Sequence, residues 1–430
     1  MFKSIVKPIQ ALPSDGKRLF STRIIRLFGY GFLSVVIALY LASAGLNERQ
    51  IGLLFTLTLL GDTLISLWIT TNADRIGRKK MLLAGAGLMI FAGVLFAITK
   101  NFYLLLIAAT IGVISPSGNE VGPFLSIEQA SLTQLVPDRL RTGVFAWYNL
   151  VGSFATASGA LCGGLLSGKL QHIGFSEFAS YRAVIMGYSL IGVILLILFF
   201  SFSSSIDIIP ERGVDAHNYQ PRVFLGLHKS RGVVLRLAGL FSIDAFAGGF
   251  VIQSLIAYWF HIKFGTDPAL LGTIFFGANI LAGISALSAT WLAKKFGLIN
   301  TMVFTHLPSN VLLMLVPLMP SLPLAIALLL VRFSISQMDV PTRQSYTMAV
   351  VAPDERSAAS GVTGVARTIG ASLSPIFTGI FLANPLLLSL PFFISGGLKI
   401  VYDLMLFQNF RHAKPPEELV PSTDPKESHK

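Results

Sequence analysis

The sequence predicts an all-α membrane protein in which two six-helix transmembrane bundles are related by a pseudo-two-fold repeat. Three observations lead to this prediction. Hydrophobic residues make up 53% of the 430 residues and charged residues only 13%, about half the charged fraction of soluble domains. Stretches of about 20 mostly apolar residues, the length that crosses a bilayer, occur in two sets of six around a polar linker. Short motifs also recur at matching places in the two sets.

The charge and cysteine content exclude several functional classes. Lys and Arg outnumber Asp and Glu, 33 to 21, which in a soluble protein would suggest a nucleic-acid partner but here fits basic loops beside a bilayer. The lone Cys162 excludes an internal disulfide and a cysteine-based zinc site. The sequence shows no nucleophile–base pair, metal-ligand cluster or phosphate-binding Gly-rich lysine motif. We therefore expect no enzymatic activity, catalytic residue, metal, cofactor or nucleic-acid partner.

The predicted spans define the domains. The first set occupies residues 24–44, 51–72, 81–99, 102–135, 143–168 and 182–204. The second set occupies residues 233–259, 269–292, 300–319, 322–350, 357–384 and 390–410. The predicted domains are an N-terminal segment 1–23, a first bundle 24–204, a linker 205–232, a second bundle 233–410 and a tail 411–430.

The basic residues orient these spans. With the N-terminus inside, most Lys and Arg fall in inner segments, and the outer loops hold only Arg49, Lys100, Lys169, Arg182 and Lys263. Because cytoplasmic loops carry an excess of basic residues, both termini are assigned to the cytoplasm of a plasma or inner membrane. The N-terminal segment lacks the apolar core of a signal peptide, so no cleavage is expected.

The fourth predicted span is too long for one straight helix. It contains Ser115-Pro116-Ser117-Gly118 and then Gly122-Pro123, so we expect a kink or a break there. Discontinuous helices often line transport sites, because the freed backbone groups can face a polar cavity.

Paired segments reveal the internal repeat. Arg26-Leu27-Phe28-Gly29 in the first span resembles Arg236-Leu237-Ala238-Gly239 in the seventh. Val136-Pro137-Asp138-Arg139 before the fifth span resembles Ala352-Pro353-Asp354-Glu355-Arg356 before the eleventh. Parallel six-helix repeats are one of the few transporter architectures, so the repeat indicates transport.

One inner loop carries a family resemblance. Ala73-Asp74-Arg75-Ile76-Gly77-Arg78-Lys79-Lys80 matches the D-R-x-G-R-[KR] signature of the major facilitator superfamily, which the chain resembles from about Ile24 to Phe410. Thr70 stands where that family usually has Gly. The resemblance implies two bundles that rock around a central cavity. It also implies an inner-face latch, in which Asp74 lies near the start of the eleventh helix and Arg78 reaches Glu128, with Arg75 and Gly77 completing the loop.

A second, partial match lies in the fifth span. The segment from Ala155 to Gly164 keeps Gly159, Gly163 and Gly164 of the family's antiporter signature, G-x-x-x-G-P-x-x-G-G, but has Ala155 and Ala160 in place of Gly and Pro. This match favours export by proton antiport. Uptake by proton symport is the runner-up, and a non-transporting membrane sensor with the same fold is a third alternative.

Carboxylates inside the membrane are candidates for proton coupling, because charges near the bilayer centre tend to be paired or functional. Asp62 and Asp244 fall close to the midplane, and Glu120 and Asp339 lie somewhat nearer the cytoplasm. Asp244 has no basic residue within a turn on its own helix, so it is the preferred proton carrier.

The resemblance implies that the first, fourth, seventh and tenth spans line the central cavity, and polar groups on these spans are candidates for substrate binding. Arg343 and Arg332 could hold a small anionic solute, because a guanidinium binds a carboxylate through two hydrogen bonds. Spacings of seven and four place Arg332, Asp339 and Arg343 on one helical face, with an Asp339–Arg343 pair as an equally weighted alternative. Asn119 and Gln253 are the uncharged candidates, and Arg343 is the preferred anchor.

Other charged groups in the spans suggest structural roles. Lys399 and Asp403, one turn apart, are expected to neutralise each other, and His306 is expected to form a hydrogen bond. For Arg367, pairing with an acid and contact with a ligand remain equally open. The sequence thus predicts a monomeric secondary active transporter that moves a small-molecule substrate across the lipid bilayer together with protons, by alternating access. The substrate itself is not readable from the sequence.

Overall fold

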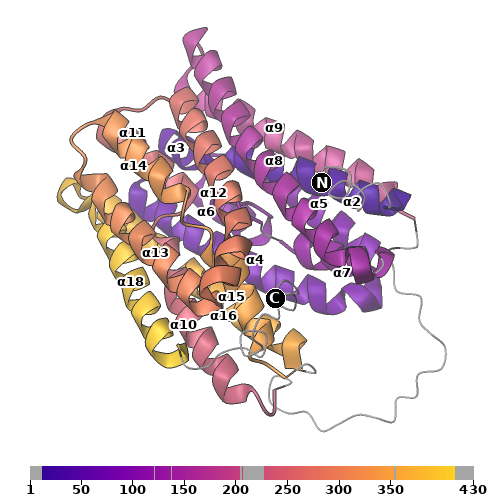
Figure 1. Cartoon of the computed structure of the whole chain (residues 1–430). Coiled ribbons are helices and arrows are strands. Elements are labelled where there is room, and N and C mark those ends of the chain that lie inside the picture. The colour runs from indigo at the N-terminus through magenta and orange to yellow at the C-terminus, as the bar shows by residue number, and fades with distance from the viewer. Residues whose placement is uncertain are drawn as a thin grey trace, which may run out of the picture.

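The computed structural model describes residues 12–120, 122–136, 138–203, 206, 227–352 and 355–411. These residues are nearly all helical, and the helices form two groups that lie side by side (Figure 1). The prediction of an all-α membrane protein with two helical bundles is confirmed. Most of the predicted linker and tail lies outside the described residues, and the exact domain boundaries stay predictions.

The first bundle begins earlier than the sequence predicts. Its first helix starts at Ser14 and not near residue 24, and Asp15 in its first turn is favourable at the positive end of a helix. The helices are α2 (Ser14–Ser34), α3 (Ile37–Ser43), α4 (Glu48–Ile76), α5 (Arg78–Ile98), α6 (Phe102–Ile111), α7 (Phe124–Leu135), α8 (Asp138–His172) and α9 (Glu177–Phe200).

The second bundle repeats this order. Its helices are α10 (Arg231–Gly249), α11 (Gln253–Phe264), α12 (Pro268–Phe296), α13 (Leu298–Leu315), η3 (Val316–Leu318), α14 (Leu322–Phe333), α15 (Asp339–Ala349), α16 (Arg356–Leu373), α17 (Pro375–Leu382), η5 (Pro385–Leu387) and α18 (Leu390–Phe410). Among the described residues, 9 segments are long and apolar enough to cross a membrane, and α2 with α3 forms a further span bent by 42°. The fourth and tenth predicted spans are each divided into two shorter helices, α6 with α7 and α14 with α15.

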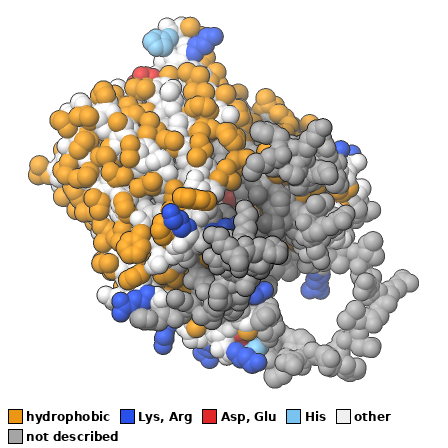
Figure 2. Space-filling model, viewed as in Figure 1, with side chains coloured by type: hydrophobic (Ala, Val, Ile, Leu, Met, Phe, Trp, Pro, Cys, Tyr) orange, Lys and Arg blue, Asp and Glu red, His pale blue; other side chains and the backbone are white. Residues whose placement is uncertain are grey.

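The outer surface fits a bilayer. Figure 2 shows hydrophobic side chains covering much of the visible side of the second bundle, whereas Lys and Arg gather at its lower rim. Exposed apolar side chains such as Leu64, Trp291, Phe304 and Val331 are unfavourable in water but suited to lipid contact. The basic rim lies at the end of the molecule that the sequence assigns to the cytoplasm. We refer to the opposite end as the predicted outer side.

The two bundles touch closely through glycines. α8 packs against α12, and α4 packs against α16 and α17. A Cβ atom on Gly164 would clash with the carbonyl oxygen of Pro268, and one on Gly52 would lie 2.5 Å from that of Pro375. Both contacts lie near the predicted outer side. The absence of a side chain at these two glycines therefore allows the bundles to meet backbone to backbone there.

Candidate functional site

Four spans are interrupted at similar places in the two bundles. The breaks occupy residues 35–36 in the first span, 112–123 in the fourth, 250–252 in the seventh and 334–338 in the tenth. The break in the fourth span is confirmed, with Gly118 and Gly122 at φ angles of 71° and 80° that favour glycine. These are the spans that are expected from the sequence to line the central cavity.

Polar groups connect these breaks across the two bundles. The backbone N–H of Ser254 donates to the carbonyl of Pro116 at 3.1 Å. The amide of Gln253, a predicted substrate residue, donates to the Ser34 hydroxyl at 2.7 Å and accepts from Asn279 at 3.1 Å. Gln253 therefore lies where the first, fourth and seventh spans meet.

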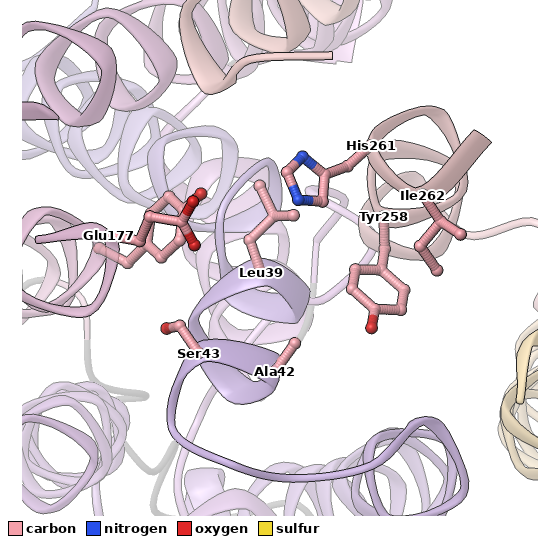
Figure 3. A pocket seen from close by; sticks show the side chains of 8 residues that line it. Leu39, Ala42, Ser43, Glu177, Tyr258, His261 and Ile262 are labelled. Atoms are coloured by element: carbon pink, nitrogen blue, oxygen red, sulfur yellow. The ribbon is translucent and has the colours of Figure 1, made fainter. Parts of the chain in front are cut away.

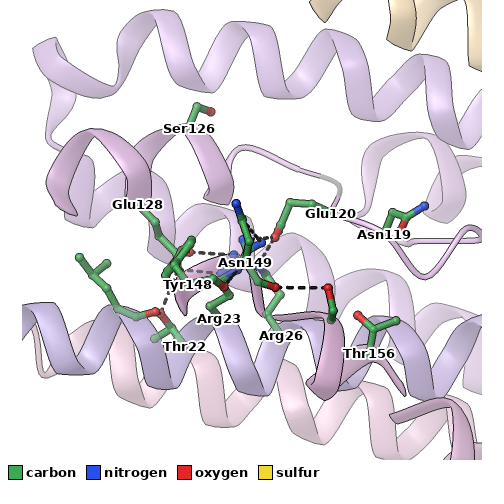
Figure 4. A network of polar contacts seen from close by, with 12 residues as sticks. Thr22, Arg23, Arg26, Asn119, Glu120, Ser126, Glu128, Tyr148, Asn149 and Thr156 are labelled. Atoms are coloured by element: carbon green, nitrogen blue, oxygen red, sulfur yellow. Dashed lines mark hydrogen bonds and ion pairs between the residues drawn. The ribbon is translucent and has the colours of Figure 1, made fainter. Parts of the chain in front are cut away.

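A cluster of two arginines and two glutamates fills the first bundle beside the fourth-span break (Figure 4). Both terminal nitrogens of Arg26 donate to Glu128 at 2.7 Å, and its Nε donates to Glu120 at 2.8 Å. Arg23 donates to the other oxygen of Glu120 at 2.8 Å. Thr22 donates to Glu128 at 2.9 Å, and Tyr148 also donates to it. The four charges balance, so this cluster holds the break in place without an additional ion.

The predicted latch partner of Arg78 is wrong. Glu128 is fully buried and bound by Arg26, whereas Arg78 donates to the side chain of Gln134 at 3.0 Å. The latch prediction counted only the loop charges as partners for Glu128 and left out Arg26. Arg75 is exposed, and Gly77 has a φ angle of 115° between α4 and α5. The side chain of Asp74 lies outside the described residues.

A second charged cluster lies in the other bundle around Asp244. Lys399 from α18 donates to one oxygen of Asp244 at 2.6 Å. Arg367 from α16 and Arg343 from α15 lie 3.1 Å and 3.3 Å from the other oxygen. Arg343 also donates to Asp339 at 2.7 Å. Four helices therefore contribute charges to one buried carboxylate cluster.

This geometry corrects three expectations. Asp244 has three basic partners, all from other helices, so the argument that made it the preferred proton carrier is wrong. Arg343 is occupied by Asp339 and Asp244, which confirms the pairing alternative and removes Arg343 as a free substrate anchor. Lys399 pairs with Asp244 at 2.6 Å and not with Asp403, whose two oxygens are bound by His306 and Asn310.

Asp403 has its own partners deeper in the bundle. It lies 2.8 Å from Nδ1 of His306 and accepts from the amide of Asn310 at 2.9 Å. The expected hydrogen bond of His306 is confirmed. Among the described residues, the ion pairs join groups of the same bundle, except that His228 at the end of the linker pairs with Glu355 of the second bundle, and none crosses from one bundle to the other.

The break in the tenth span separates Arg332 from the residues expected on the same face. Arg332 lies in the last turn of α14, whereas Asp339 and Arg343 lie in the first two turns of α15, so the expectation of one continuous helical face is wrong. Only 9% of Arg332 is exposed, and its Nε has no hydrogen-bond partner among the described residues. Asn119 lies exposed in the fourth-span break, where its carbonyl accepts from Ser115 at 2.7 Å.

Asp62 differs from the other carboxylates in the interior of the described spans, which leaves aside Glu48 and Glu177 at span ends. No basic side chain of the described residues pairs with it. It lies beside the backbone N–H of Gly122 in the fourth-span break and near the hydroxyl of Ser66. Asp62, Ser66 and Thr70 follow one another at helical spacing on α4, away from the strongly exposed Leu64 and Trp68.

A pocket of about 470 Å³ opens on the predicted outer side between the bundles. Figure 3 shows Glu177 and His261 on opposite sides of it, with Leu39 between them. Its lining residues are Leu39, Ala42, Ser43, Glu177, Tyr181, Tyr258, His261 and Ile262. None of the predicted site residues lines this pocket.

Arg23 and Arg26 are site residues that the sequence-based prediction missed. The sequence nevertheless indicates that Arg26 is a candidate, because it is a charged residue inside the first predicted span and belongs to the repeated motif Arg26-Leu27-Phe28-Gly29. A buried charge needs a partner, and Glu120 and Glu128 lie in the only other span of the first bundle that carries two acids.

Comparison with known proteins gives the same assignment from independent sources. A model of the Major Facilitator Superfamily matches residues 19–375 and also residues 240–427. The chain is 30% identical over 417 residues to the uncharacterized membrane protein YJR124C of Saccharomyces cerevisiae, covering 91% of this chain and 93% of that protein. It is 24% identical over 394 residues to the multidrug efflux protein YfmO of Bacillus subtilis, covering 90% and 91%.

A solved structure has the same fold. The crystal structure of a D-xylose–proton symporter superimposes with a TM-score of 0.70 at 15% sequence identity, covering 91% of this chain and 97% of that one. At this identity the likeness concerns the fold alone.

Proposed function

Because the chain belongs to the major facilitator superfamily, we propose that it is a proton-coupled secondary active transporter in which Asp62 carries the proton. The observation that carries this proposal is the isolation of Asp62. The other described carboxylates in the interior of the spans each have a basic partner, namely Glu120, Glu128, Asp244, Asp339 and Asp403, whereas Glu48 and Glu177 lie at span ends. An unpaired charge inside the membrane is costly, so a proton is the simplest compensation for Asp62.

The position of Asp62 supports a link between protonation and rocking. Asp62 lies beside Gly122 in the fourth-span break, and its helix α4 packs against the second bundle through α16 and α17. Protonation of Asp62 therefore changes the charge at a helix that joins the two bundles. Two-state proteins respond to such a change when the charge is better accommodated in one state than in the other.

Two directions of transport have separate support. YfmO is described as an efflux protein, and the glycines of the fifth span agree with export by antiport. Uptake by symport is favoured by the way in which α4 runs antiparallel to α17 and, before it in the chain, α16. Gly52 contacts Gly379, and the Thr56 hydroxyl accepts from the backbone of Ile376 at 3.0 Å. Continuing this antiparallel register brings Asp62 level with the turn that carries Arg367, so a solute at Arg367 and a proton at Asp62 can bind near each other.

The remaining assignments belong to the same proposal. The protein acts as a monomer in a plasma or inner membrane, with both termini in the cytoplasm. Asp244 and Asp339 stabilise the second bundle, and Glu120 holds the fourth-span break. Gln253 and Asn119 contribute polar contacts to the solute.

The test begins with a thermal-shift screen of the purified protein against metabolites and drugs. Solutes that stabilise it are then followed in proteoliposomes with and without a pH gradient. Asp62→Asn should abolish accumulation driven by the gradient but leave solute exchange, which needs no net proton movement, and Asp62→Glu should restore accumulation. Glu177→Gln, which removes an exposed carboxylate at the start of α9 and outside the interior of the span, serves as the control. Accumulation by Asp62→Asn would remove Asp62 from coupling. Binding of a solute without any transport would instead favour the alternative that the protein is a non-transporting membrane sensor with the same fold.

A further inference from the structure

We propose that Arg367 is the docking point for a carboxylate group on the transported solute. The inference rests on the proposed function, because it assigns the substrate class of the same transporter. It begins from the charges inside the second bundle. Among the described residues of its spans, Arg332, Arg343, Arg367 and Lys399 face only three acids, Asp244, Asp339 and Asp403.

The excess positive charge is concentrated on Arg367 and Arg332, because the other charged groups are fully paired. Lys399 and Arg343 are held by Asp244 and Asp339 at 2.6 Å and 2.7 Å, and Asp403 is held by His306 and Asn310. Arg367 has one contact, from Nη1 to the oxygen of Asp244 that it shares with Arg343. Arg332 has no acid within ion-pair distance in the described part of the chain. A negatively charged solute would balance this excess.

Arg367 is also the accessible member of the cluster. Its side chain is 32% exposed, whereas that of Arg343 is 7% exposed and that of Lys399 is 10% exposed. Since Arg367 uses only Nη1 toward Asp244, its other guanidinium nitrogens can donate to a carboxylate. Paired donation of this kind is the strongest common mode of carboxylate recognition.

The face of α16 that carries Arg367 is suited to water and not to lipid. Ser360, Gly361, Gly364 and Thr368 are all exposed there, at spacings of three and four that place them on the same side as Arg367. The apolar side chains of Ile369 and Leu373, exposed by 45% and 44%, lie on a different side. A polar exposed face in the middle of a span indicates an aqueous cavity.

This substrate class also bears on the direction of transport. Protonation of Asp62 removes a negative charge that would repel an anion on Arg367, and the α4–α17 register, continued along α16, brings the two residues to a similar depth. Binding of one therefore favours binding of the other. Of the two directions proposed above, a carboxylate solute selects uptake together with a proton.

The first test measures the electrostatic potential at this face without knowledge of the natural solute. Thr368→Cys in a Cys162→Ala background places one reactive thiol next to Arg367, and Gly364→Cys provides a second reporter one turn away. Membrane vesicles are treated with anionic and with cationic methanethiosulfonate reagents from the predicted cytoplasmic side. Relative to a free thiol in solution, the ratio of anionic to cationic rates should rise about tenfold, as expected for one unit charge nearby.

Variants then show which residue produces this electrostatic potential. Arg367→Gln should return the ratio to that of the free thiol, whereas Arg356→Gln, at the start of the same helix, should leave it raised. An unchanged ratio in Arg367→Gln, or a thiol that neither reagent reaches, would overturn the proposal. Asp244 keeps Lys399 and Arg343 in the Arg367→Gln variant, so the bundle should still fold.

A second arm tests carboxylate binding itself. Succinate and benzoate should slow labelling of the Thr368→Cys variant several-fold, and the matching amides, succinamide and benzamide, should not. Equal rates with the acids and the amides would contradict a carboxylate site. Neither arm uses a pH gradient. If Asp62→Asn retains gradient-driven accumulation while the labelling results hold, the proton assignment fails and the carboxylate site stands.

Discussion

The ammonium of Lys399 lies 2.6 Å from a carboxylate oxygen of Asp244, although the two residues belong to α18 and α10 at opposite ends of the second bundle's sequence. Both side chains are almost entirely buried, at 10% and 4% exposure. A buried charge that loses its partner is destabilising by roughly 3–5 kcal/mol, whereas replacing both partners is often neutral. The pair therefore closes the bundle by joining its first span to its last.

Removing one partner of this pair should cost more than removing both. Asp244→Asn leaves Lys399, Arg343 and Arg367 around a neutral amide, so its unfolding temperature in detergent should fall strongly. The double variant Asp244→Asn, Lys399→Met should recover part of this loss, because one unpaired cation is gone. A double variant less stable than Asp244→Asn would show that Lys399 contributes through packing and not through charge.

Arg26→Lys should destabilise the first bundle although it conserves the charge. Lysine cannot reproduce the two parallel bonds to Glu128 and the third to Glu120, because its three donors sit on one nitrogen and lack the planar fork of a guanidinium. Roughly 1–3 kcal/mol of stability should be lost, the cost of leaving buried acceptors unsatisfied. The control is Arg236→Lys, which lies at the matching place in the repeat but is exposed. Equal unfolding temperatures for both variants would contradict the role of the cluster.

Side chains at the interbundle glycines should open the predicted outer side. Gly164→Val or Gly52→Val would push a Cβ into the carbonyl oxygen of Pro268 or Pro375, so the contacts could not close. Spin labels at Ser43 and Ile262, one in each bundle, should then report a longer distance than in the parent protein. Gly87→Val, where a Cβ would have no neighbouring atom within 4 Å, should leave the distance unchanged.

Glu355 should make the stability of the predicted cytoplasmic end depend on pH. Burial raises its pKa, but donors from Ser230 and His228 outweigh burial and lower the pKa from 4.5 to about 2. Because the folded-state pKa is depressed, the stabilisation is complete above about pH 4.5 and is lost as the pH falls toward 2. The unfolding temperatures of the parent protein and Glu355→Gln should therefore differ at neutral pH and converge in strong acid. A difference that persists at the lowest pH would contradict this linkage.

The orientation in the membrane can be tested with single cysteines in a Cys162→Ala background. Phe175→Cys, in the turn between α8 and α9, should react with an impermeant thiol reagent added to intact cells. Arg411→Cys, after α18, should react only after the membrane is permeabilised. The reverse pattern would invert the predicted orientation.

The sequence predicts helices and local breaks better than it predicts charge partners. The Pro and Gly residues around 115–123 predict the break in the fourth span. The break at 334–338 contains neither, but Pro341 three residues into α15 was a usable signal, since its ring would clash with the carbonyl of residue 337 in a continuous helix. The partners of Asp244 come from three other helices, and a sequence read along one helix at a time cannot place them together.

The confinement of ion pairs to single bundles has a mechanical consequence. In the proposed rocking motion each cluster moves as an intact unit, and the contacts that must separate are hydrogen bonds, such as Gln253 with Ser34 and Tyr258 with Glu48, and the glycine backbones of α8 and α12. Breaking a neutral hydrogen bond costs about 1 kcal/mol net, far less than exposing a buried ion pair. The speed of interconversion should therefore respond to lipid thickness and lateral pressure and remain nearly indifferent to ionic strength.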